Sequence, residues 1–196
     1  MLAMMLEQAR EYWAELHERP WQPVPRLAAF AWTGFYSLFL VHALRSHSGF
    51  LWIDNANFVV HEGGHLLFSH LGYMPGIWGG TVLQMLVPLL LAATFYTQRE
   101  PHGFVFCTFL FFENFLYTAT YMADARALSL PLLGIGDDVG HDWNIIFSSL
   151  GVLHLDTRVA TVMRVIGWCG MLGAAGWMAR RGWIASSRGR ASAAGG

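Results

Sequence analysis

The chain has 196 residues, of which 55% are hydrophobic and only 13% are charged. Soluble domains carry about a quarter charged residues, so this composition indicates a protein embedded in a lipid bilayer. The formal net charge is -1 and all basic residues are arginines, a pattern that excludes a nucleic-acid-binding surface. The N-terminus is rich in glutamate, unlike the basic start of a signal peptide.

Residues 1–26 predict an N-terminal amphipathic helix. Apolar residues recur there at helical spacing, with glutamate and arginine between them, for example at Leu2, Leu6 and Trp13. This pattern is typical of a helix that lies in the membrane interface. A helix docked against a membrane bundle fits the pattern equally well.

Four apolar runs are close to the roughly 20 residues that a helix needs to cross a bilayer. They are residues 27–44, 81–97, 103–123 and 159–179. Residues 50–71 are also helical in pattern but carry several acidic and histidine side chains, so this helix must be shielded by the others, with its polar face inward. We therefore predict an all-α, polytopic transmembrane bundle of about five membrane helices in a domain spanning 27–180.

Two segments are expected to be irregular. Residues 72–80 contain four glycines and a proline, and such a segment can form a re-entrant loop where protein covers it. Residues 181–196 consist largely of arginine, serine, glycine and alanine, so we expect a disordered tail.

The arginines give a weak signal for orientation. Arg180, Arg181, Arg188 and Arg190 predict a cytoplasmic C-terminus by the positive-inside rule. Five spans would then put the N-terminus outside, although Arg10, Arg19 and Arg26 favour the cytoplasm. From the compact size we expect an integral protein of a prokaryotic inner membrane.

The polar helix contains the motif His61-Glu62-Gly63-Gly64-His65. Two histidines four residues apart project from one face of a helix and can share a tetrahedral zinc ion, while the glutamate serves as a general base. One ionised side chain at mid-bilayer costs at least about 2.5–3.5 kcal/mol, so such residues indicate a function. The motif predicts a Zn²⁺ site with the ligands His61 and His65 and the catalytic base Glu62.

A later segment, residues 112–126, contains Asn114 and Asp124. Together with HExxH, this segment resembles the site-2 protease group of intramembrane zinc metalloproteases, over roughly residues 55–126. Members of that family have a three-helix core in which one helix bears HExxH and a later one bears an asparagine followed by an aspartate ligand. The resemblance implies that Asp124 is the third zinc ligand and that Asn114 binds the substrate.

Other residues compete for the place of the third ligand, because a catalytic zinc has three protein ligands and one open position. His141 and Asp142 lie in the connection 134–143, where Asp142 could also begin a short helix. Glu113 could be a ligand, be protonated, hydrogen-bond to a zinc histidine, or pair with Arg126 or Arg164. The sequence leaves these alternatives open.

The predicted function is an intramembrane zinc metalloprotease. It would hydrolyse a peptide bond in a membrane-embedded or juxtamembrane substrate, with Zn²⁺ to activate water and Glu62 as general base. The alternative is a non-catalytic, zinc-binding membrane subunit that binds a partner protein. A histidine-rich di-iron oxygenase is disfavoured, because the chain has a single histidine pair with ligand spacing.

Overall fold

The computed structural model describes residues 1–46, 49–131 and 140–194, and these ranges are helical with no strand. The described helices are α1 (Leu2–Glu18), α2 (Arg26–Arg45), α3 (Asp54–Phe68), α4 (Tyr73–Thr97), α5 (Pro101–Ala123), α6 (Asp142–Ser149) and α7 (Asp156–Ala194). Short 3-10 turns, η1 (Ser69–Leu71) and η2 (Leu153–Leu155), follow α3 and precede α7. The predicted all-α fold class is confirmed.

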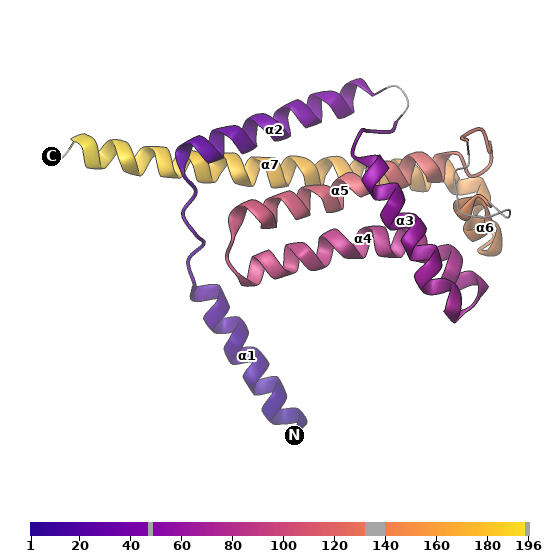
Figure 1. Cartoon of the computed structure of the whole chain (residues 1–196), viewed down its shortest axis with the longest axis horizontal. Helices are drawn as coiled ribbons and strands as arrows, with labels where there is room; N and C mark the ends of the chain where they lie inside the picture. The colour runs from indigo at the N-terminus through magenta and orange to yellow at the C-terminus, as the bar shows by residue number, and fades with distance from the viewer. Residues whose placement is uncertain (47–48, 132–139, 195–196) are drawn as a thin grey trace.

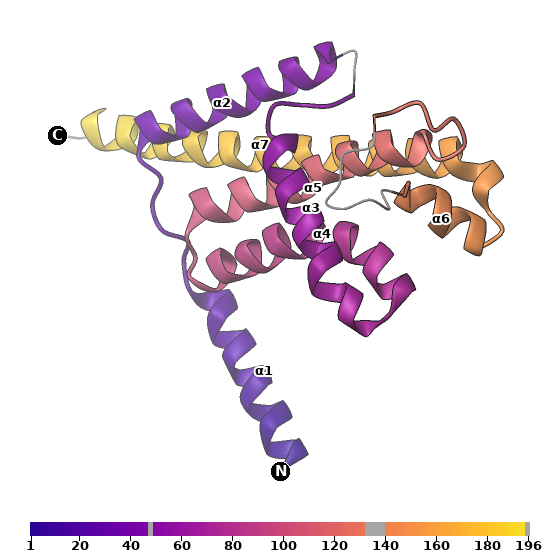
Figure 2. The same cartoon turned by 45° about the vertical axis from the view of Figure 1, so that its right-hand side comes forward.

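Four helical segments are long and apolar enough to cross a membrane, as expected of a membrane protein. They are α2, α4, α5 and the stretch Leu153–Ile184, which contains most of α7. These helices run roughly side by side, and α3 crosses α4 obliquely (Figures 1 and 2). With 15 residues, α3 is about 22 Å long, shorter than the bilayer core of about 30 Å. The described chain therefore has four candidate spans by length and composition, and α3 is shorter than each of them.

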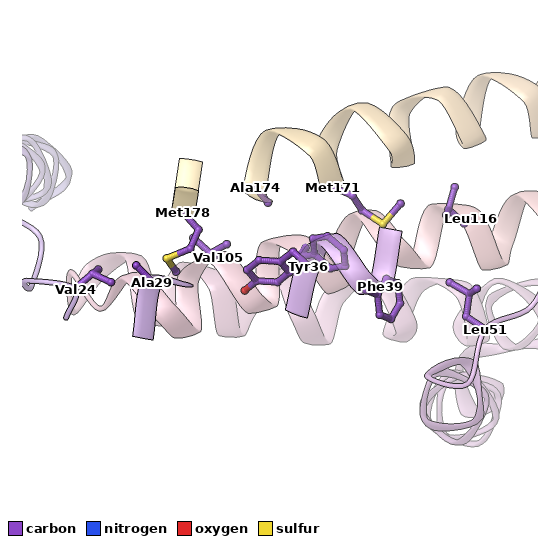
Figure 3. Close-up of a cluster of buried hydrophobic side chains, with 11 residues drawn as sticks. Val24, Ala29, Tyr36, Phe39, Leu51, Val105, Leu116, Met171, Ala174 and Met178 are labelled. Carbon is purple, nitrogen blue, oxygen red and sulfur yellow. The ribbon is translucent and has the colours of Figure 1, made fainter. Parts of the chain in front are cut away.

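The bundle is held together by an aromatic core between α2, α5 and α7. Tyr36 and Phe39 of α2 pack on Phe109 of α5, with ring centroids 4.8 Å and 5.3 Å apart. Met171 and Met178 approach the same cluster from α7 (Figure 3). Close van der Waals packing of this kind drives association between helices inside a bilayer.

The crossing of α3 and α4 depends on glycine. Gly64 of α3 lies directly against Gly79 and Gly80 of α4, so a Cβ atom on Gly64 would overlap the Gly79 carbonyl group. A Cβ on Gly79 would in turn come within 2.5 Å of the Gly64 oxygen. Small residues allow two helix backbones to approach this closely, and they fix α3 against α4.

Residues 73–80 form the first two turns of α4 instead of the expected re-entrant loop. Gly72 makes the tight turn with φ +121°, a conformation that favours glycine. Pro75 follows within the first helical turn, where its missing N–H leaves no hydrogen bond unmade. Gly76, Gly79 and Gly80 are thus helix-packing residues.

The two ends of the chain are also helical. Residues 2–18 form α1, as predicted, and α7 continues to Ala194 through most of the segment expected to be disordered. Alanine and arginine favour helices, which accounts for this difference. At its C-terminal end α1 is tied to the bundle, because the Arg99 guanidinium donates to the Leu16 carbonyl oxygen. The position of α1 in the membrane interface stays a prediction.

The two glycines of the HExxH motif provide a test of this packing. Gly64→Ala should lower the stability of the full chain in detergent by about 1–3 kcal/mol or more, because the new methyl group is forced into the α4 backbone. Gly63 is the matched control, because its Cβ would meet only the Leu83 side chain, at 3.9 Å. Gly63→Ala should be neutral or stabilising by up to about 1 kcal/mol. Equal thermal unfolding midpoints for the two variants would contradict the glycine contact.

Candidate metal centre

Three side chains from two distant segments converge at the crossing of α3 and α4. The Asp142 Oδ2 atom lies 2.9 Å from the His61 Nε2 atom and 3.2 Å from the His65 Nε2 atom. Two ligand atoms on a tetrahedral zinc at about 2.0–2.1 Å are separated by about 3.3 Å. The three residues therefore form a group with the spacing of a metal site.

The other nitrogen of each imidazole is held by α4. The His61 Nδ1 atom is 3.1 Å from the Gln84 Oε1 atom, and the His65 Nδ1 atom is 2.8 Å from the Gly76 carbonyl oxygen. Because both partners are acceptors, Nδ1 carries a proton in each ring, and Nε2 is the atom that faces Asp142 and is available to a metal ion. Metal-binding histidines are typically fixed in this way.

Gly80 leaves room for an ion at this point. A Cβ atom there would lie 2.6 Å from the His61 Nε2 atom and 2.7 Å from the His65 Nε2 atom. The space beside both ligand nitrogens is thus kept free by the absence of a side chain. Two imidazoles and one carboxylate are donors that suit zinc, so the residues present fit a bound metal ion.

Helix α6 brings Asp142 to the histidines. Its start is capped by His141, whose Nδ1 atom accepts a hydrogen bond from the Asn144 N–H. The Asn144 side chain donates to the Ala125 carbonyl oxygen at 2.7 Å, which ties α6 to the end of α5. The Tyr121 hydroxyl accepts from the Asp142 N–H, and its ring packs on His141 at a tilt of 33°. These contacts between α6 and the end of α5 hold Asp142 in place.

Asp124 lies outside this group of three. Its carboxylate accepts hydrogen bonds from the Ser129 N–H, the Ser129 hydroxyl and the Leu130 N–H, and its Oδ2 atom is 3.5 Å from the His141 Nε2 atom. The structure thus brings Asp142, rather than Asp124, to the two histidines. Asp124 instead organises the turn after α5 and contacts the residue that caps α6.

Asn114 is also placed differently from the expectation for a substrate-binding residue. It is only 2% exposed, and its Oδ1 atom accepts from the Gln84 side chain at 2.6 Å. Gln84 in turn accepts from His61, so Asn114 orients His61 through Gln84. Our sequence interpretation missed Gln84, although a lone glutamine within the apolar run 81–93 was a signal of a buried polar contact.

Glu113 points to a different cluster. Its Oε2 atom accepts from the Asn57 side chain at 2.9 Å, one helical turn before His61. It is neither in the group of three nor hydrogen-bonded to a histidine of that group in the described structure. The predicted pairing of Glu113 with an arginine is likewise absent among the ion pairs of the described residues.

The charges at the site favour a bound cation. Burial opposes ionisation of the Asp142 carboxyl, but hydrogen bonds from His61 and His65 outweigh this effect and hold its pKa below the ordinary value. The hydrogen bond to the same carboxylate raises the pKa of His65 to about 9. A metal ion bound between these atoms takes the place of the proton.

A cavity of about 720 Å³ opens beside the three candidate ligands. His61, His65, Asp142 and Glu62 all line it, as do the rings of Phe58, Tyr117 and Tyr121. Ligand sites in proteins typically have volumes of about 300–1,000 Å³ and combine apolar walls with a few polar groups. The candidate general base and the candidate metal ligands therefore face one space that can admit a substrate.

No protein-family model matches the chain, and no match appears among curated proteins or solved structures. The resemblance to site-2 proteases therefore stays an expectation from the motifs.

Metal analysis of two aspartate variants distinguishes the candidate third ligands. The full chain purified with zinc should retain about one metal ion per chain, whereas Asp142→Ala should lose most of it during dialysis, because only two protein ligands remain. Asp124→Asn is the control and should retain its metal, because its oxygen still accepts from the 129–130 turn. Loss of metal in Asp124→Asn with retention in Asp142→Ala would assign the third ligand to Asp124.

Proposed function

We propose that this protein is an intramembrane zinc metalloprotease with His61, His65 and Asp142 as metal ligands. The observation that carries the proposal is the convergence of both HExxH histidines and one carboxylate beside a cavity that Glu62 also lines. Two histidines and a carboxylate leave a fourth position for water or substrate, as in catalytic zinc sites. The oblique placement of α3 among apolar spans favours a substrate that is itself in or next to the membrane.

Different residues of the chain would have different roles in peptide hydrolysis. A zinc ion bound there would polarise the scissile carbonyl group and lower the pKa of water to about 7. Glu62 would accept the proton from the attacking water and return it to the leaving amine. Gln84 and the Gly76 carbonyl group would hold the two imidazoles in the required tautomer. The aromatic side chains of the cavity would bind the unwound substrate segment.

Glu62→Gln tests the proposed reaction. The variant should bind about one zinc per chain and unfold at the same temperature as the native protein, because Glu62 is not one of the three converging ligands. Hydrolysis should fall at least about 10²-fold, since a general base typically contributes 10²–10⁴. The measurement uses proteoliposomes with labelled casein or single-span model peptides, and mass spectrometry to detect new termini.

The alternative function, a zinc-binding subunit that only binds a partner, gives a different result. No metal-dependent cleavage would occur with the native protein, and Glu62→Gln would complement a deletion strain as well as the native chain does. Cleavage that persists unchanged in Glu62→Gln would remove that residue from its proposed role. Loss of zinc in Glu62→Gln would instead assign Glu62 to the metal site.

We also propose that both chain ends face the cytoplasm of a prokaryotic cell. With four spans, the N-terminus and C-terminus lie on the same side of the membrane. The starts of α2 and α5 and the end of α7 share one end of the bundle (Figure 1). Arg19, Arg26, Arg99, Arg180 and Arg181 all belong to this end, as the positive-inside rule requires of the cytoplasmic side. The candidate metal centre then lies toward the opposite face.

Reporter fusions at the two ends test this orientation. Green fluorescent protein fused to either end of the full chain should fluoresce, and alkaline phosphatase fused to either end should be inactive in bacterial cells. A fusion within the connection between α5 and α6 should show the reverse pattern. Opposite results at the two ends would mean an odd number of spans, and would contradict the proposed position of α3.

A further inference from the structure

A second buried polar cluster joins α3 to α5, one to two turns before the HExxH motif. The Asn57 side-chain nitrogen donates to the Asp54 Oδ1 atom at 3.1 Å and to the Glu113 Oε2 atom at 2.9 Å. Asp54 also accepts from the Leu51 N–H at 2.6 Å. Both carboxyl groups thus share the Asn57 side-chain nitrogen as a donor. This cluster is separate from the three candidate metal ligands.

Both acidic side chains are removed from solvent, and no cation among the described residues balances them. Glu113 is 0% exposed and Asp54 is 5% exposed. The chain contains no lysine, and neither carboxyl group belongs to an ion pair within the described ranges. The Tyr117 phenol interacts electrostatically with both. Two buried negative charges without a neighbouring cation would be very unfavourable.

The hydrogen bonds of the cluster require one more donor. Ionised carboxylates only accept hydrogen bonds, so two of them cannot bond to each other. The Glu113 Oε1 atom is fully buried and has no hydrogen-bond partner. A proton on one of the carboxyl groups removes one charge and supplies the missing donor. Carboxyl pairs that share a proton in this way are known from acid catalytic sites.

We propose that Asp54 and Glu113 form a proton-binding site that holds a single shared proton at neutral pH. The Asn57 amide and the shared proton together fasten the N-terminal half of α3 to α5. Asp54 also lines the cavity beside the candidate metal centre, so the site can exchange its proton with the water that enters there. The proposal does not depend on the presence of zinc or on peptidase activity.

Infrared spectroscopy can detect the proton directly. At neutral pH the full chain in detergent should show the C=O stretch of a buried carboxylic acid, and this band should disappear in Glu113→Gln. Glu11→Gln is the matched control, because Glu11 is exposed on α1, far from the buried cluster. The band should remain in that variant. A native spectrum without an acid band, or one unchanged in Glu113→Gln, would overturn the proposal.

The dependence of stability on pH provides a second, independent measurement. A carboxyl that keeps its proton in the folded chain and loses it on unfolding makes folding take up a proton. Stability therefore falls as pH rises, by about tenfold in the folding equilibrium per pH unit at most. Glu113→Gln mimics the neutral acid, so it should remove this part of the pH dependence and be no less stable than the native chain at pH 8.

Two outcomes of the stability measurement would count against a shared proton. If Glu113→Gln were as unstable as Glu113→Ala, the fold would need the carboxylate charge. A second metal ion per chain that is lost in Glu113→Gln, while the first is retained, would mean that a cation rather than a proton neutralises the pair. Retention of the native metal content in Glu113→Gln together with a flatter pH profile supports the proposal.

Discussion

The close backbone contact between Gly64 and Gly79 is the constraint on which the rest of the site depends. It places α3 so near α4 that the histidines of the motif can reach hydrogen-bond acceptors on α4 with their Nδ1 atoms. Gly80, the next residue, keeps the space beside their Nε2 atoms open. A larger residue at any of these positions would separate the helices or fill the space for the ion. The same three glycines therefore determine both the packing and the chemistry.

Helix α5 supports the site without supplying a ligand. Asn114 fixes Gln84, which fixes His61, and Glu113 fixes Asn57 on the polar face of α3. Gln84, Glu113 and Asn114 lie within spans that are otherwise apolar, where an unpaired polar group is costly. The membrane environment thus makes the hydrogen-bonded network highly specific, because few alternative arrangements satisfy every member.

The sequence was sufficient to predict the helices and the HExxH pair, because these depend on local periodicity and spacing. It was not sufficient for the third ligand. Asp124 and Asp142 are both aspartates that follow the same span, and only the long-range contacts of α6 decide which carboxylate faces the histidines. The polar pattern of residues 50–71 also gave no measure of helix length, and α3 takes up 15 of these 22 residues.

Asp124 and Asp142 lie near each other in the structure, although only Asp142 faces the histidines. Both residues lie at the same end of α5, and Asp124 binds the turn 129–130 and contacts His141, the residue directly before Asp142. An aspartate at the end of this helix can therefore contribute to the site in two ways, as a ligand or as the support for the segment that carries the ligand. In this chain the supporting role falls to Asp124, since its oxygens are already occupied by three donors. Both roles act at the same end of the bundle, where a carboxylate can approach α3. In this chain α6 supplies that carboxylate.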